Sequence, residues 1–280
     1  MGTQTTWPEQ ALVGYVTAYT NTPNEMITEA LANSYKVFVY AFGNIDGANT
    51  VTLPDGITEA GLAAQLSDIH AGGGLALLSF GGQNNTFNPG SDAMQAADNT
   101  VSLIQKYGFD GVDLDLEQIS VGTDYLETYI QEMRNKFSDI LLTCAPQIAG
   151  GYGGPASFAP ANVFTTDFLA QAKFDAILVQ EYNQYGGAVF DGKEDTDPGF
   201  IAASFGPLTK IVPSESKIVI GEPATVSAGS GLSNPEDVVS DINSNGIRQS
   251  PQYGGIMTWA INYDAGQNWA FAKGVSQVIS

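Results

Sequence analysis

The amino-acid sequence predicts a (β/α)8 barrel, an α/β fold built as one domain over residues 1–280. Short β-rich runs alternate with helical stretches along the whole chain, in eight strand-then-helix units. The first run continues as Gly14-Tyr15-Val16-Thr17, without the glycine-rich phosphate turn that a doubly wound open sheet usually has at this place. No proline-rich linker or block of charge divides the chain. The barrel is therefore favoured over the open sheet.

The predicted strands are short runs of β-branched and other apolar residues, bounded by glycine or polar turn residues. They cover residues 12–16, 36–42, 74–80, 111–117, 139–145, 174–182, 217–221 and 255–261. The stretches 148–161 and 191–197 are predicted to be long loops on the rim of the barrel, where barrel enzymes carry their active sites.

The predicted helices follow the strands and carry ordinary start and stop signals. They cover residues 25–32, 58–70, 91–107, 124–137, 166–172, 234–242 and 268–279. Three glycines at 72–74 follow the second helix, and Gly108 follows the third. Pro235 stands at the first position of the helix that Asn234 begins, where proline costs no hydrogen bond.

The composition excludes several classes of protein. The 280 residues include 30 Asp and Glu against 10 Lys and Arg, which gives a formal net charge of −20. Nucleic acids and anionic membranes repel such a polyanion, so we expect a neutral or cationic partner. One cysteine, Cys144, forms no internal disulfide, and one histidine, His70, removes zinc sites that need several imidazoles. No apolar run approaches the roughly 20 residues of a membrane span, and no signal peptide is visible.

The most informative segment is the predicted strand 111–117. Because side chains alternate along a strand, Asp113, Asp115 and Glu117 share one face and the apolar residues between them share the other. The apolar face should pack against helices, so the acids point into the barrel. Three carboxylates spaced about 7 Å apart do not all ionise in a partly buried site, and we expect a retained proton on Glu117, nearest the mouth.

Three other interpretations of this segment compete with a catalytic role. A solvated face would suit only an edge strand, whereas both faces of a barrel strand are covered. A calcium loop of the EF-hand type needs glycine at its sixth position, where the count from Asp113 reaches Gln118. A magnesium site of carboxylates alone remains open. Asp110 is out of phase with the other acids, so we expect a structural role at the turn. The acidic stretch 191–197 could bind calcium, although such loops are usually solvated.

The pattern Asp110-x-x-Asp113-x-Asp115-x-Glu117 resembles the signature of glycoside hydrolase family 18, the chitinases and their relatives. Other motifs resemble family segments in the same order along the chain. They are Ser79-Phe80-Gly81-Gly82, Gln180-Glu181-Tyr182-Asn183 and the segment 255–264, which contains Trp259. The interval between Gly221 and Gly255 is too short for the α+β domain that many family members carry there. The chain therefore resembles the small bacterial and plant chitinases.

The resemblance implies retaining hydrolysis in which the N-acetyl group of the substrate is the nucleophile. By this analogy Glu117 protonates the glycosidic oxygen and then acts as a base toward water. Asp115 orients the acetamido N–H and stabilises the oxazolinium ion, and Asp113 shares a proton with Asp115. Tyr182 donates its hydroxyl to the acetamido oxygen. No cofactor and no metal are implied.

The same resemblance assigns five residues to substrate binding. Trp259 would form the apolar floor beneath the −1 sugar, and Tyr15 would line the same subsite. Gln180 and Asn183 are further binding candidates, and Ser79 would donate a hydrogen bond to Asp113 from the third strand. Gln180 and Tyr182 fall on one face of their strand, which agrees with this assignment.

These residues predict an endo-acting hydrolase of β-1,4 bonds between N-acetylglucosamine units in chitin and chitooligosaccharides. An endo-β-N-acetylglucosaminidase that cleaves the chitobiose core of N-glycans is an alternative with the same chemistry. A non-catalytic chitin-binding lectin is an alternative of another class, although such relatives typically lack the terminal acid that is Glu117 here. We expect a secreted monomer whose partner is chitin or its oligosaccharides, without nucleic acid or membrane as partners.

Overall fold

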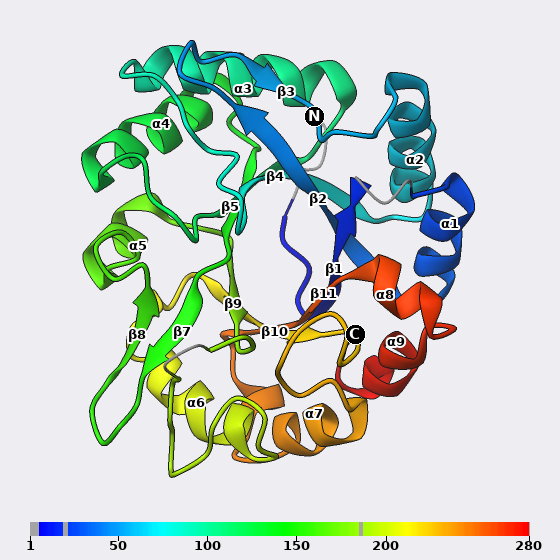
Figure 1. Cartoon of the computed structure of the whole chain (residues 1–280), viewed down its shortest axis with the longest axis vertical. Coiled ribbons are helices and arrows are strands. Elements are labelled where there is room, and N and C mark those ends of the chain that lie inside the picture. Colours follow the sequence, from blue (N-terminus) through cyan, green and yellow to red (C-terminus); the bar gives the residue numbers. More distant parts are fainter. Residues whose placement is uncertain (1–5, 19–21, 185–186, 280) are drawn as a thin grey trace.

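The computed structural model describes residues 6–18, 22–184 and 187–279, which form the predicted barrel (Figure 1). Within these residues, eight parallel strands make up the cylinder: β1 (Ala11–Thr17), β2 (Tyr35–Ile45), β4 (Leu75–Gly81), β5 (Gly111–Asp115), β6 (Leu141–Cys144), β9 (Ala176–Gln180), β10 (Lys217–Pro223) and β11 (Tyr253–Trp259). The pairing of β1 with β11 and of β9 with β10 closes it. The single-domain (β/α)8 fold is thereby confirmed.

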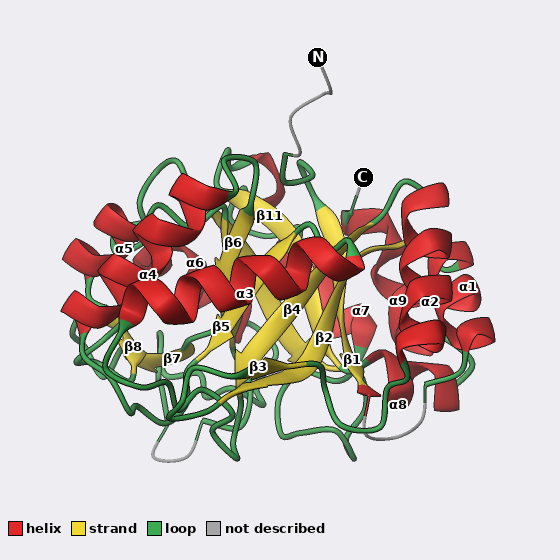
Figure 2. Cartoon of the chain, turned by 90° about the horizontal axis from the view of Figure 1, so that it is seen from above, coloured by secondary structure: helices red, strands yellow, loops and turns green. Residues whose placement is uncertain are grey.

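Helices surround the strands on the outside (Figure 2). They are α1 (Asn24–Ala32), α2 (Glu59–Ala71), α3 (Ala93–Tyr107), α4 (Thr123–Lys136), α5 (Thr166–Ala172), α6 (Phe200–Leu208), α7 (Pro235–Ile242), α8 (Ile261–Gly266) and α9 (Ala270–Val275). Side-chain oxygens of Thr58, Asp92 and Thr165 accept backbone N–H groups at the starts of α2, α3 and α5. Within the described ranges, no helix combines the length and apolar character needed to span a membrane.

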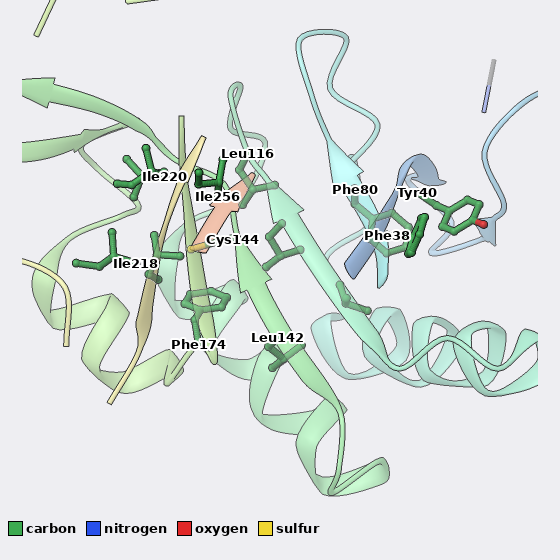
Figure 3. Packing of buried hydrophobic residues seen from close by; sticks show 14 of the residues in the cluster. Phe38, Tyr40, Phe80, Leu116, Leu142, Cys144, Phe174, Ile218, Ile220 and Ile256 are labelled. Atoms are coloured by element: carbon green, nitrogen blue, oxygen red, sulfur yellow. The ribbon is translucent and has the colours of Figure 1, made fainter. Parts of the chain in front are cut away.

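The alternation of side chains along the strands separates two apolar layers. Outward residues such as Leu142, Ile218 and Ile256 pack in the layer between strands and helices, which Figure 3 shows from close by. Inward residues such as Leu178 and Val219 fill the barrel itself. The outer layer is the larger of the two, so most of the hydrophobic stabilisation lies outside the barrel and the interior is free to hold polar groups.

Two expectations about individual elements were wrong. The stretch 148–161 contains a β-hairpin, in which β7 (Gln147–Gly150) pairs antiparallel with β8 (Ala156–Ala159). Its glycines hid the strand pattern, yet Gly150 and Gly151 adopt the positive φ values that the turn of the hairpin uses. The closing helix, α9, is also shorter than the predicted 268–279, because it begins at Ala270 and changes to a 3-10 turn at Ser276. The helix α8, which begins at Ile261, was not predicted.

Two other elements escaped the sequence analysis. The helix α6 contains Gly206 and Pro207, residues with poor helix propensity, and its N-terminus is capped by Asp241, which comes from α7. The two-residue strand β3 (Val51–Thr52) pairs with the extended end of β2. Between β10 and β11 the chain contains only α7 and a 3-10 turn (Ile247–Gln249), so the predicted lack of an inserted α+β domain is confirmed.

Gly81 ends β4 at a point where the backbone of the acid-bearing strand passes very close. Its φ is 117°, and a Cβ at this position would lie 1.9 Å from the backbone oxygen of Asp115. The next N–H, that of Gly82, donates to the same oxygen at 2.7 Å. The absence of a side chain at Gly81 therefore lets β4 contact the backbone of Asp115.

We predict that Gly81→Ala lowers the free energy of unfolding by about 3 kcal/mol or more, because strain at positive φ and displacement of the neighbouring backbone add. Gly108→Ala is the matched control, since Gly108 has a φ of 85° but no atom within 4 Å of the added Cβ. This control should lose only about 1 kcal/mol. Urea unfolding of both variants measures the difference, and equal losses would contradict the steric argument.

Candidate active site

The three acids predicted to face the barrel interior do so. Asp113 and Asp115 are 0% and 4% exposed, and Glu117 is half-buried. Leu114 and Leu116, which alternate with them, belong to the outer apolar layer. The strand β5 ends at Asp115, so Glu117 stands in the loop that leaves the strand, at the carboxyl end of the barrel.

Asp113 accepts hydrogen bonds from three hydroxyl groups on three other strands. Tyr15 and Ser79 donate to Oδ2 at 2.8 and 2.6 Å, and Thr143 donates to Oδ1 at 2.6 Å. Ser79, Asp113 and Thr143 are register partners across β4, β5 and β6, so they lie at one level of the barrel. Burial raises the pKa of Asp113, and the three hydroxyl groups lower it.

Asp115 is held at one of its two oxygens. Gln180 donates from Nε2 to Oδ1 at 2.9 Å and to the backbone oxygen of Ala145 at 2.8 Å, which fixes the amide between β6 and β9. Among the described residues, Oδ2 has no hydrogen-bond partner. Burial raises the pKa of Asp115 well above its ordinary value, and the charges of Glu117 and Asp113 add to the rise.

The acids nearest the groove favour a retained proton. Burial raises the pKa of both Asp115 and Glu117, and the two groups influence one another, so a proton on either one favours ionisation of the other. No hydrogen bond joins Asp113 to Asp115 in the described part of the chain, because hydroxyl donors occupy the oxygens of Asp113. The carboxyl of Glu117 has no partner among the described side chains.

Aromatic side chains flank these acids. Tyr182 follows β9 and is 5% exposed, and its hydroxyl has no hydrogen-bond partner in the described residues. Trp259 ends β11 and stacks on Phe42, with ring centroids 6.0 Å apart and an interplanar angle of 18°. Tyr15 contacts both of these rings, at centroid distances of 5.5 Å from Trp259 and 6.4 Å from Phe42. A single aromatic cluster thus joins the groove to the hydroxyl that supports Asp113.

A groove of about 800 Å³ lies over the acids. Its lining includes six of the residues predicted from the sequence: Asp115, Glu117, Gln180, Tyr182, Asn183 and Trp259. The other three are buried: Asp113, and Tyr15 and Ser79, which both donate hydrogen bonds to it.

Sequence reasoning missed further residues of the lining, which lie at or after the carboxyl ends of the barrel strands, with Gln147 at the start of β7 and Tyr263 in α8. They are Ala41, Phe42, Asp55, Gln83, Asn84, Thr86, Gln147, Ala228 and Tyr263. Their position after predicted strands was a usable signal, since such loops form the sites of barrel enzymes. Thr143 was also missed, although alternation along its strand places it on the face that carries Asp113's partners.

Asn183 ties the end of β9 to the loop after β10. Its N–H donates to the backbone oxygen of Ser230 at 2.6 Å, and its Oδ1 accepts the Ser230 N–H at 2.8 Å. Its φ of 56° lies in the left-handed region, which asparagine tolerates better than most residues. Asn183 therefore lines the groove, and its hydrogen bonds to Ser230 also hold two parts of the groove wall together.

Acids outside the groove have structural contacts. Asp110 accepts the Ala76 N–H at 2.8 Å and contacts Nε2 of His70 at 3.0 Å, which confirms its expected role at a turn. In the stretch 191–197, Asp195 and Asp197 accept backbone N–H groups. In the described part of the chain, no cluster of three or more His, Cys, Asp or Glu side chains is arranged to hold a metal ion.

Comparisons with known proteins agree with the family resemblance of the motifs. A family model described as "Glycosyl hydrolases family 18" matches residues 11–249. The chain is 27% identical to Chitinase Chi52 of Paenibacillus xylanexedens over 94% of its own length and 60% of that protein. It is 28% identical to the Probable class II chitinase of Arthroderma benhamiae over 78% of this chain and 81% of that one. The chain thus spans about 60% of the Paenibacillus protein.

Solved structures share the fold. The putative Chitinase A from Streptomyces coelicolor superimposes with a TM-score of 0.78 at 23% identity, over 96% of this chain and 98% of that one. The xylanase and alpha-amylase inhibitor protein XAIP-II from Scadoxus multiflorus superimposes with a TM-score of 0.70 at 21% identity, over 96% and 99%. At such identities the likeness concerns the barrel and leaves the chemistry to be argued from the site.

We predict that Thr143→Val lowers the free energy of unfolding by about 1–3 kcal/mol, because one oxygen of a buried acid loses its donor. The loss should be larger at pH 8 than at pH 5. The Thr143 hydroxyl lowers the pKa of Asp113, so its removal raises that pKa in the folded protein and disfavours the ionised form, which prevails at high pH. Urea unfolding at both pH values measures this.

Thr100→Val is the control for this prediction. Thr100 is also buried, but its hydroxyl contacts the Tyr129 hydroxyl and the Ala96 backbone oxygen rather than an acid. Its loss should be the same at both pH values. A pH-independent loss in Thr143→Val would contradict the support that we assign to Asp113.

Proposed function

Because the chain belongs to the glycosyl hydrolases of family 18, we propose that it is a retaining chitinase that cleaves internal β-1,4 bonds between N-acetylglucosamine units. The family match confirms the resemblance inferred from the motifs. One observation carries the proposal: Glu117, Asp115 and Tyr182 each present a polar atom without a partner among the described residues, in a groove that Trp259 also lines.

Glu117 suits the role of the acid. Its half-buried carboxyl has a raised pKa, which favours the protonated form at the pH of the reaction. The proton passes to the glycosidic oxygen as the bond between that oxygen and the anomeric carbon breaks. The acetamido oxygen of the same sugar attacks the anomeric carbon and forms an oxazolinium ion. Water then opens this ion with Glu117 as base, so the configuration at the anomeric carbon is retained.

Asp115 suits the role of the group that faces the acetamido N–H. Gln180 fixes one of its oxygens and leaves the other free to accept a hydrogen bond from the substrate. The charge of Glu117 raises the pKa of Asp115, so a proton on Glu117 removes this repulsion and favours an ionised Asp115. The resulting negative charge stabilises the cationic oxazolinium ion.

Tyr182 and Trp259 complete the proposed binding of the reacting sugar. Burial and the charge of Asp115 raise the pKa of Tyr182 well above its ordinary value, so its hydroxyl stays protonated and donates to the acetamido oxygen. The indole of Trp259, stacked on Phe42, offers an apolar surface to the C–H face of the ring. The described residues that line the groove include no Lys, Arg or His, which agrees with an uncharged polysaccharide.

We predict that Glu117→Gln reduces kcat on chitin oligomers by about 10²–10⁴-fold, because the amide supplies neither the acid nor the base. The Kd for the same oligomers should change little, since the shape of the side chain is kept. Glu215→Gln is the matched control, an exposed glutamate before β10 at the opposite end of the barrel. Unchanged hydrolysis by Glu117→Gln would overturn the assignment of the acid.

The proposed function itself is tested by product analysis on N-acetylglucosamine oligomers beside a high-mannose glycoprotein. We expect shorter oligomers whose new reducing ends are first formed as the β-anomer in NMR spectra, and no release of glycan. Activity should survive a chelator. Release of glycan would favour the N-glycan hydrolase, and binding without cleavage would favour the lectin. Loss of activity with the chelator would favour the magnesium site of carboxylates instead.

A further inference from the structure

Two glutamates outside the groove are fully buried on neighbouring strands. Glu181 directly follows β9 and Glu222 belongs to β10, and both are 0% exposed. Gln180 is the register partner of Gly221, and the Glu181 N–H donates to the Gly221 oxygen at 3.0 Å. The two glutamates therefore occupy adjacent positions, one residue further along the paired strands.

Both glutamates face the outer layer. Glu181 is in phase with Val179, and Glu222 is in phase with Ile220, and these apolar partners belong to the layer between strands and helices. Figure 1 shows α6 and α7 outside this part of the barrel. Tyr182 is adjacent to Glu181 in sequence but belongs to the inner layer. The glutamates thus lie directly behind the groove wall, in the layer between strands and helices.

Few donors compensate these acids. Both carboxyl oxygens of Glu181 contact the hydroxyl of Ser204 in α6, at 3.0 and 2.9 Å. Oε2 of Glu222 accepts the Leu232 N–H at 2.9 Å, while its Oε1 is buried without a partner among the described residues. No ion pair with a described Lys, Arg or His involves either glutamate.

The other titratable groups around the pair are also acidic. Asp195 lies in the connection between β9 and α6, and Asp241 belongs to α7, with Asp237 beside it; Tyr182 stands on the groove side. Two carboxylates in an apolar layer do not both ionise without a cation. Burial raises the pKa of Glu181 to about 8, and burial together with the charge of Glu181 raises the pKa of Glu222 well above its ordinary value.

The bond from Glu222 fixes a segment that forms part of the groove. This segment, residues 228–232, includes Ala228, which lines the groove, and Ser230, which pairs with Asn183 in both directions. Gly231 lies between Tyr182 and Glu222: a Cβ there would be 2.6 Å from Tyr182 Cβ and 2.7 Å from Glu222 Oε2. The packing of Tyr182 therefore depends on the position of this segment, which Glu222 holds.

We propose that Glu181 and Glu222 form a protonated carboxyl pair that positions Tyr182 and the segment 228–232, and that ionisation of this pair adds to the alkaline loss of activity that deprotonation of Glu117 causes. The inference rests on the proposed function, since it concerns the same groove. When the pair ionises, the two charges repel one another inside the apolar layer. The segment 228–232 then moves away from Tyr182, which loses the support of Gly231 at its Cβ.

Ionisation of the pair lowers the stability of the folded protein as pH rises, whereas in common acid denaturation stability falls as pH falls. Because both acids bind protons more tightly in the folded protein than in the unfolded chain, the folded state holds more protons between the ordinary pKa and the raised one. Stability due to the pair is therefore full at pH values below the ordinary pKa of glutamate and is lost as pH rises through about 8.

The test is the double variant Glu181→Gln/Glu222→Gln, whose amides imitate the neutral acids at every pH. We expect the midpoint of the alkaline loss of kcat on chitin oligomers to move up, toward the pH at which deprotonation of Glu117 alone limits the reaction. The fall in Tm between pH 5 and pH 9 should also shrink. Glu215→Gln, an exposed glutamate, is the control and should change neither profile.

A second variant keeps the test decisive if the double variant does not fold. Gly231→Ala inserts a methyl group between Tyr182 and Glu222 and should lower kcat at all pH values more than it changes KM, because it displaces a group used in the chemical step. Gly206→Ala, whose added Cβ meets no atom within 4 Å, is its control.

The outcomes separate the two proposals. An inactive parent protein overturns the proposed function, while the Tm profiles still test the protonation of the pair. Parent and double variant with superimposable kcat and Tm profiles overturn the role of the pair and leave the proposed function supported by the parent's activity. An unchanged kcat in Gly231→Ala overturns the positioning of Tyr182.

Discussion

A carboxyl group inside a closed barrel has little water around it, so its hydrogen-bond donors have to come from the neighbouring strands. This requirement governs the structure around β5. Asp113 meets it with hydroxyl groups from β1, β4 and β6. Those donors reach it only because Ser79 and Thr143 occupy the same level of the cylinder as Asp113. The register of three parallel strands is therefore part of the site, and a slip of one residue would point the hydroxyl groups of Ser79 and Thr143 away from the acid.

From Asp113 toward the groove, the acids of this strand have progressively fewer hydrogen-bond partners. Both oxygens of Asp113 have donors, one oxygen of Asp115 has Gln180, and the carboxyl of Glu117 has no partner among the described residues. Reactivity requires free polar atoms, whereas stability requires satisfied ones. A period of two along one strand supplies both, because it carries the support and the reactive group on the same face at different depths.

How much of this could be read from the sequence depended on whether the signal was local. The alternation of Asp113, Asp115 and Glu117 and the shared face of Gln180 and Tyr182 need only the period of a strand, and both hold in the structure. Alternation places Thr143 on the inward face of its strand, and Phe42 stands at the end of a predicted strand. Their contacts with Asp113 and Trp259 depend on the register between strands and on the packing of distant rings, which no local pattern contains. The helix α6 was not predicted for a related reason. Gly206 and Pro207 have poor helix propensity, and burial of the apolar residues of α6 outweighs that propensity in the folded protein.

The interior acids also change the meaning of the formal charge of −20. Burial raises the pKa values of the groove acids Asp115 and Glu117 and of the outer-layer acids Glu181 and Glu222, so the charge at neutral pH is smaller than the formal one. All four bind protons more tightly in the folded protein, and each therefore favours folding at mildly acidic pH. Tyr182 lies between the two groups, facing the groove while its neighbour Glu181 faces the helices. Because adjacent residues of one strand point to opposite sides, Glu181 and Glu222 do not line the groove themselves, and their protonation reaches it through the segment 228–232, which Glu222 holds and which packs against Tyr182.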